Sequence, residues 1–298
     1  MLLEAKDLSV KHRHGALAVN RLSFSLDKGQ TLTVLGDTES GKTSLLKAIA
    51  GLYKISDGEL FLHGKIANDM PISDRNTRLL HEDGGFFTHR SALYNLTYPL
   101  KVRRADTTVD PVFIKADLLK KKVFRLTVEE KTALMMERLN LPFGEIFLLD
   151  DPFKPFPKEK RKDMFLFYLP FIRSLADRGA LIYATSSYFE AETLDAPTLL
   201  IHYGNEQQFG IVSDFATRPN SLCALYYSSA DYSSGIARIE FSNGETVAEC
   251  DNGEMYPLDK KYLLNEIYIG KEVIYAKTSE DIFFFDKKCE QRIYFPEQ

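Results

Sequence analysis

Apolar and polar residues alternate along the start of the chain in the way that predicts β-strands. This period of two runs through residues 2–10 and 22–26. A short apolar run, TLTVL at residues 31–35, predicts a buried strand, and the stretch TSLLKAIAGL at residues 43–52 has the apolar spacing of a helix. Residues 36–44, GDTESGKTS, therefore lead directly from a strand into a helix.

The middle of the chain predicts further strands that alternate with helices. Apolar runs predict strands at residues 146–149, 180–184 and 198–202. The charged residues between about 101 and 145 predict helical structure, and so do residues 158–178. Strands that alternate with helices in this way are typical of an α/β domain.

The pattern changes near residue 218. From there on, short apolar segments alternate with turns rich in Gly, Asn and Asp, and Asn243 followed by Gly244 is a strong hairpin signal. We therefore predict a mixed α/β domain over residues 1–217 and a small β domain over residues 218–298.

The segment between the first buried strand and the first helix has the form G-x-x-x-x-G-K-T. Backbone N–H groups of such a loop form a nest for phosphate, and the dipole of the following helix adds to the attraction. The lysine would reach the outer phosphates, and the threonine hydroxyl would bind Mg²⁺. A chance match in a glycine turn is the alternative, but the flanking strand and helix favour a phosphate-binding loop. The predicted nucleotide-binding residues of this loop are Gly36, Asp37, Thr38, Glu39, Ser40, Gly41, Lys42, Thr43 and Ser44.

An acidic residue follows the predicted strand at residues 146–149. Asp150 ends the run IFLLD, where a carboxylate can hold Mg²⁺ and its water shell, so Thr43 and Asp150 are the predicted metal ligands. The alternative is that Asp150 merely caps the turn before Pro152. The sequence lacks the N-K-x-D motif that reads guanine, which favours an adenine nucleotide.

Charge and cysteine content narrow the classes of partner. The formal net charge is −4, so the whole molecule does not have the excess of positive charge that marks a nucleic-acid binder, and we expect no nucleic-acid partner. The three cysteines include no C-x-x-C pair, which fits a reducing compartment. The longest apolar run, residues 164–172, is far below the roughly 20 residues that span a bilayer.

Together, the opening LSV…ALAVNRLSFSLDKGQTLTVLG, the phosphate loop, the strand-end aspartate and the β-rich tail resemble the ATP-binding subunit of ATP-binding cassette (ABC) transporters. The chain looks most like the importer type with a C-terminal regulatory β domain, which serves sugars, ferric iron, polyamines or sulfate. The resemblance covers nearly the whole chain. It implies an α/β P-loop NTPase domain of ABC type with a helical subdomain at about residues 95–145, followed by a small all-β, OB-like domain.

The same resemblance implies cofactors, partners and a location. The cofactors are ATP and Mg²⁺. The partners are transmembrane permease subunits and a second ATP-binding subunit, in a homodimer or a heterodimer. The chain would lie in the cytoplasm, peripheral on the inner face of the cell membrane. Importers of this kind couple ATP binding and hydrolysis to transport.

Several positions depart from the pattern of the family. Where the family has an aromatic residue that stacks on adenine, this chain has His12 and His14, and His14 is the predicted contact. Glu82 stands in the place of a Gln that senses the γ-phosphate, and its carboxylate could bind Mg²⁺ but cannot donate a hydrogen bond as an amide does. Phe86, Phe87 and His89 would lie near the docking surface for a membrane subunit, unless the phenylalanines belong to a satellite core.

The hydrolytic motifs are altered as well. The signature L-S-G-G-Q is replaced by residues 126–130, LTVEE, in which Thr127 and Glu130 predict an ordinary helix capping box. Asp151 replaces the catalytic Glu with a side chain shorter by one methylene, and Ser186 replaces the switch His. The resemblance therefore assigns Glu82, Asp151 and Ser186 to catalytic positions. The loop after Asp151 reads Lys154, Pro155, Phe156 and Pro157, which stiffens the segment.

Two hypotheses remain open at this point. In the first, the chain is a divergent importer subunit that hydrolyses ATP slowly, with Asp151 as the base. In the second, it is a non-catalytic nucleotide-binding subunit that dimerises and docks on a membrane partner. We lean to the first because Lys42 and the phosphate loop are intact. A P-loop protein of another class, such as a small-molecule kinase, is a third possibility that the β-rich tail disfavours.

Overall fold

The computed structural model describes residues 1–12, 15–81, 83–217, 219–221, 233–242, 245–258, 268–278, 281–287 and 291–293. His14, Glu82 and the predicted turn at Asn243 and Gly244 lie outside these residues. The chain divides into two compact units: Met1–Ala196 with Tyr203–Asn205, and Pro197–His202 with Glu206–Gln298. The boundary predicted at residue 217 stays a prediction.

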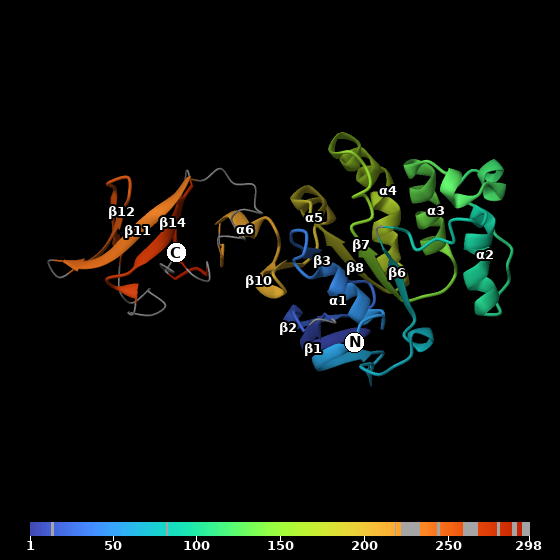
Figure 1. Ribbon diagram of the computed structural model, residues 1–298, viewed down its shortest axis with the longest axis horizontal. Helices are drawn as coiled ribbons and strands as arrows, with labels where there is room; N and C mark the ends of the chain where they lie inside the picture. The colour runs from blue at the N-terminus through green and yellow to red at the C-terminus, as the bar shows by residue number, and fades with distance from the viewer. Residues whose placement is uncertain are drawn as a thin grey trace. The chain divides into compact units, whose positions relative to one another are not determined.

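The first unit contains an antiparallel sheet with the strand order β2-β1-β4-β5 (Figure 1). Its strands are β1 (Leu3–Lys11), β2 (Leu17–Leu26), β4 (Ile55–Leu62) and β5 (Lys65–Ile66). Alternate residues such as Leu3 and Ala5 in β1, and Leu22 and Phe24 in β2, are buried. The predicted period of two is confirmed for residues 22–26, whereas in β1 it is interrupted by irregular pairing after Ala5, and Leu8, Ser9 and Val10 are all buried.

The first unit also holds four neighbouring parallel strands in the order β3-β8-β7-β6. They are β3 (Thr31–Leu35), β6 (Thr77–Leu80), β7 (Ile146–Asp150) and β8 (Ala180–Thr185). Every residue of β7 and β8 is buried, as expected where helices cover both faces of a parallel sheet. Because parallel strands end at one edge, the loops after β3, β7 and β8 meet there, which places the predicted site.

Three helices follow these strands along the chain: α1 (Lys42–Ile49) after β3, α4 (Lys158–Arg178) after β7 and α5 (Tyr188–Leu194) after β8. Helix α1 begins after Gly41, whose φ is +108°, and a Cβ there would lie 2.2 Å from the carbonyl oxygen of Ala18. Only glycine allows both this backbone angle and this close approach, so the second glycine of the loop is fixed by sterics.

The segment between β6 and β7 is less helical than the sequence suggests. Helices α2 (Ala92–Val102) and α3 (Val128–Asn140) are present, but between them lie only the short 3₁₀ turns η2 (Ala116–Lys120) and η3 (Val123–Arg125). The expectation of helical structure is wrong for residues 103–115 and 141–145, and between them it fails at residues 121–122 and 126–127 as well. The run DTTVDP explains it, because β-branched residues and Asp are weak helix formers and Pro111 lacks an amide hydrogen. A further 3₁₀ turn, η1 (Ile72–Asp74), precedes β6.

The second unit contains an antiparallel sheet in the order β13-β12-β11-β14-β15. Its strands are β11 (Ser233–Ser242), β12 (Glu245–Cys250), β13 (Met255–Leu258), β14 (Glu272–Lys277) and β15 (Ile282–Asp286). Ile239, Val273 and Phe284 are among the residues of its hydrophobic core. The prediction of a β-rich C-terminal region is confirmed. The unit also includes β9 (Thr198–His202), most of β10 (Asn205–Gly210) and the short helix α6 (Asp214–Thr217).

No helix among the described residues is both long enough and apolar enough to cross a membrane.

Candidate functional site

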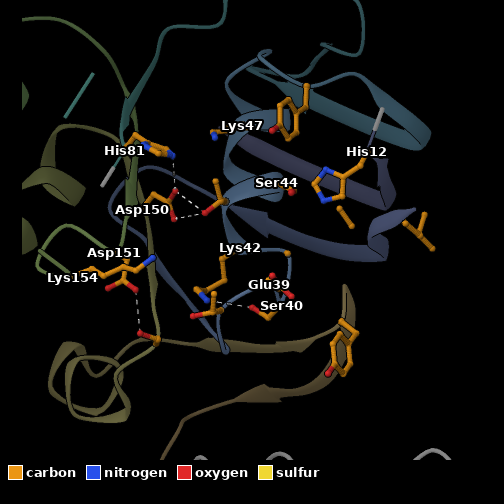
Figure 2. A pocket seen from close by; sticks show the side chains of 18 residues that line it. His12, Glu39, Ser40, Lys42, Ser44, Lys47, His81, Asp150, Asp151 and Lys154 are labelled. Atoms are coloured by element: carbon orange, nitrogen blue, oxygen red, sulfur yellow. Dashed lines mark hydrogen bonds and ion pairs between the residues drawn. The ribbon is translucent and has the colours of Figure 1, made fainter. Parts of the chain in front are cut away.

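A cavity of about 710 Å³ lies over the loop that joins β3 to α1. The loop and the start of α1 contribute Thr38, Glu39, Ser40, Gly41, Lys42, Thr43, Ser44 and Lys47. The ends of the parallel strands contribute His81, Asp150, Asp151 and Ser186. Figure 2 shows His81, Asp150 and Asp151 along one side of the cavity and His12 on the other side.

Lys42 is held inside the loop that precedes it. Its Nζ donates to the carbonyl oxygens of Gly36 and Asp37, both at 2.6 Å, and to Ser40 Oγ at 3.3 Å. The residue is 7% exposed. Burial lowers the pKa of this ammonium, and the nearby Asp151 and Asp150 partly oppose that effect. The loop thus presents a buried cation at the N-terminus of α1, an arrangement suited to an anion.

Thr43 and Asp150 both line the cavity and are in contact, although 107 positions separate them in the sequence. Thr43 Oγ1 donates to the Asp150 carboxylate, at 3.0 Å from Oδ1 and 2.8 Å from Oδ2. His81 Nε2 lies 3.8 Å from Asp150 Oδ2. A hydroxyl and a buried carboxylate are oxygen donors of the kind that Mg²⁺ prefers, so this pair fits the predicted metal. When bound, the ion would neutralise charge on the phosphates.

Asp151 has a strained backbone, and each oxygen of its carboxylate accepts a hydrogen bond. Its φ is +45°, in the left-handed region that non-glycine residues rarely adopt. Arg161 Nη2 donates to Oδ1 at 2.5 Å, and Ser186 Oγ donates to Oδ2 at 3.1 Å. Sequence reasoning placed Asp151 and Ser186 in the site, and the structure places them in contact. Their roles in catalysis stay predictions.

Arg161 was missed by the sequence reasoning. Its Nε donates to Glu190 Oε1 at 2.8 Å, and Glu190 is 1% exposed. Tyr183 and Thr185 donate their hydroxyls to the other oxygen of Glu190, at 2.9 and 2.6 Å. Burial alone would lower the pKa of Arg161, but hydrogen bonding and proximity to Glu190, together with Asp151, raise it. The only signal in the sequence was a lone arginine within a basic run, which ordinarily marks a solvated face.

Of the two histidines considered for contact with adenine, His12 lines the cavity, together with Tyr53 and Lys47, which the sequence reasoning did not single out. The His12 and Tyr53 rings are in edge contact with centroids 6.3 Å apart, and Lys47 Nζ lies 5.6 Å from the Tyr53 centroid. The predicted contact His14 lies outside the described residues, as does Glu82.

Two of the predicted loop residues contribute to the site through Lys42 and do not line the cavity themselves. Gly36 and Asp37 do not line the cavity, but their carbonyl oxygens hold the ammonium of Lys42. Lys154, in the stiff segment after Asp151, does line it.

At the N-terminus of α3, where the family signature would stand, two backbone N–H groups are occupied by side chains of the same turn. Thr127 Oγ1 accepts from the backbone N–H of Glu130 at 3.2 Å, and Glu130 Oε2 accepts from the backbone N–H of Thr127 at 2.8 Å. The predicted capping box is therefore confirmed. Glu129 adds a second carboxylate in the same turn.

Comparison with known proteins identifies this architecture. The family model described as ABC transporter matches residues 19–154. The sn-glycerol-3-phosphate import ATP-binding protein UgpC of Roseobacter denitrificans is 26% identical over 230 residues, which cover 74% of this chain and 63% of that protein. The spermidine/putrescine import ATP-binding protein PotA of Bacteroides fragilis is 26% identical over 268 residues, or 85% of this chain and 57% of that protein. The chain thus spans less than two thirds of the length of these relatives.

A solved structure shares the fold. It is the dimeric structure of a post-hydrolysis state of the ATP-binding cassette MJ0796 bound to ADP and Pi. The TM-score is 0.60 at 15% sequence identity, over 70% of this chain and 98% of that chain. Residues 19–154 therefore match the ABC transporter family, and the chain shares the P-loop fold of an ATP-binding cassette and has an antiparallel β-rich C-terminal region.

Proposed function

We propose that this chain is the ATP-binding subunit of an ABC importer and that it binds MgATP in the cavity over α1. The single observation that carries the proposal is the convergence of Lys42 and Thr43 from α1 and Asp150 from β7 on one cavity. Lys42 would exchange its loop carbonyls for the outer phosphates. Thr43 and Asp150 would hold Mg²⁺, and the nucleoside would lie towards His12 and Tyr53. The named functions of the relatives support import rather than another use of ATP.

A membrane partner is supported by the surface around α2. Phe87 is 48% exposed and its ring contacts those of Tyr94 and Tyr98, at centroid distances of 5.7 and 5.0 Å. Phe86, by contrast, packs against the core. Exposed aromatic groups of this kind are enriched at protein interfaces. We therefore propose that transmembrane permease subunits dock here on the inner face of the cell membrane, and that the chain pairs with a second ATP-binding subunit.

Two versions of the function differ in the fate of ATP. In the first version the chain hydrolyses ATP slowly, with Asp151 as the base and Ser186 beside it. In the second version it holds ATP without hydrolysing it, and the ion pair between Arg161 and Asp151 specifically favours this version. Both versions need an intact phosphate loop.

The test measures nucleotide binding and steady-state MgATP turnover by the purified full chain, with Lys42→Ala beside it. Binding of a fluorescent ATP analogue that the substitution weakens by about tenfold or more is expected, because a buried charge-assisted contact with phosphate is lost. Equal binding by the two proteins would overturn the proposal. Turnover above the Lys42→Ala level selects the slow ATPase, and turnover equal to it selects the holder.

A further inference from the structure

The acidic residue after β7 is engaged by one arginine. Arg161 Nη2 donates to Asp151 Oδ1, and the same guanidinium donates through Nε to Glu190. The Arg161 side chain is 18% exposed, and those of Asp151 and Glu190 are 9% and 1% exposed. Ion pairs shielded from water to this degree are strong and geometrically specific, because little solvent competes for the donors.

Arg161 is held in place by a second carboxylate, because its Nε donates to Glu190. Glu190 receives hydroxyl hydrogen bonds from Tyr183 and Thr185 in addition to the guanidinium. Arg161 Nη2 also reaches Thr185 Oγ1 at 3.3 Å. Arg161 belongs to α4, Glu190 belongs to α5, and Thr185 ends β8. Contacts with α5 and β8 therefore fix the position of the guanidinium independently of its contact with Asp151.

This arrangement limits what Asp151 can do to water. In hydrolysis, the oxygen of water forms a bond to the γ-phosphorus while the bond from that phosphorus to the ADP oxygen breaks and its electron pair stays with ADP. A carboxylate that orients the water and takes its proton needs a free lone pair directed into the cavity. Here Oδ1 accepts from Arg161 and Oδ2 accepts from Ser186, so each oxygen has only its remaining lone pair for a water, and taking a proton from that water would weaken the ion pair with Arg161.

We propose that Arg161 is a positioning residue that clamps Asp151 in a closed ion pair, and that this clamp limits ATP hydrolysis at the site. The inference rests on the proposed nucleotide-binding function. It adds to the effect of the shorter Asp151 side chain, which has one methylene fewer than the Glu of the family. It predicts that changing a residue that does not line the cavity increases turnover. The opposite role, in which Arg161 orients Asp151 as a working base, predicts a loss of turnover from the same changes.

The experiment changes Arg161 in the full chain in two ways. Arg161→Lys keeps a positive charge beside the buried Glu190, but a single ammonium lacks the planar fork that spans both carboxylates. The double variant Arg161→Gln/Glu190→Gln removes both charges, so Glu190 is not left as a buried unpaired carboxylate while Asp151 is released from the ion pair. At least one of these variants is expected to fold, as judged by circular dichroism and a cooperative thermal transition.

Each folded variant is expected to raise the maximal rate of MgATP hydrolysis by about tenfold or more, because a general base contributes at least that much. The KM for MgATP should stay close to the wild-type value, since the phosphate loop is untouched. Adding Asp151→Asn to either variant should remove the gain. A purely structural role for Arg161 would lower the rate or leave it unchanged.

Arg173→Lys is the matched control. Arg173 also lies on α4 and donates to the carbonyl oxygen of Thr193 at 2.6 Å, but it does not contact Asp151. Its substitution should leave turnover at the wild-type level. If the folded Arg161 variants bind nucleotide and hydrolyse no faster than the wild type, the clamp is overturned while the proposed function stands. If the wild type binds no nucleotide, the proposed function and this inference both fail.

Discussion

At the scale of single residues, the contact between Thr43 and Asp150 makes metal dependence the sharpest property to test. Thr43→Val removes the hydroxyl and keeps the β-branched shape. Mg²⁺ should then strengthen nucleotide binding less than it does in the wild type, by about tenfold or more, because one oxygen donor is lost. The measurement is titration with a fluorescent ADP analogue, in Mg²⁺ and in EDTA.

Thr43→Ser is the control for that substitution, since it keeps the hydroxyl and should keep most of the Mg²⁺ effect. Affinity in EDTA should be similar for all three proteins, because Lys42 and the loop amides are unchanged. An undiminished Mg²⁺ effect in Thr43→Val would show that the ion is held without this hydroxyl.

The same residues show which half of the site the sequence could predict. Residues 36–44 are continuous in sequence and lead from β3 into α1, so the motif alone predicted where Lys42 and Thr43 lie. Asp150 could be placed because a carboxylate at the end of a buried strand has few other uses. The contact of Arg161 with Asp151 and Glu190 could not, because it joins a loop, α4 and α5, and nothing local in the sequence specifies which basic residue turns inward.

At the scale of elements, the capping box holds the first turn of helix α3, while Leu134, Met136 and Leu139 pack the rest of the helix into the core. Thr127→Ala removes the acceptor for the Glu130 N–H and should lower the free energy of unfolding by about 1 kcal/mol. Urea denaturation of the full chain followed by circular dichroism measures this loss.

Thr127→Ser keeps the acceptor oxygen and should stay within a few tenths of a kcal/mol of the wild type. A loss of equal size in both variants would mean that the threonine methyl, rather than the cap, supports the helix. The capping box could be predicted because both partners lie within one turn. The interruption at residues 103–115 was missed because charge alone does not separate a helix from a solvated loop.

At the scale of the whole molecule, we expect the charge on the first turn of α3 to control whether two copies can share a nucleotide. The family resemblance implies that this helix faces the triphosphate of a partner subunit. The Glu129 backbone N–H and the Thr127 hydroxyl hold the pKa of Glu129 below its usual value, and its side chain is 49% exposed. A second copy of the chain would therefore bring a charged carboxylate, rather than free amide donors, towards the phosphates.

We expect MgATP to drive little self-association of the wild type for this reason, and we expect the substitution pair Val128→Gly/Glu129→Gly to increase it. The pair removes one charge and one bulky side chain but leaves Thr127 and Glu130 to cap the helix. Sedimentation velocity with and without MgATP should show a dimer in the variant that is absent or weaker in the wild type. The increase should disappear when Lys42→Ala is added, because it depends on bound nucleotide. Identical sedimentation of variant and wild type in MgATP would mean that this helix turn does not control pairing.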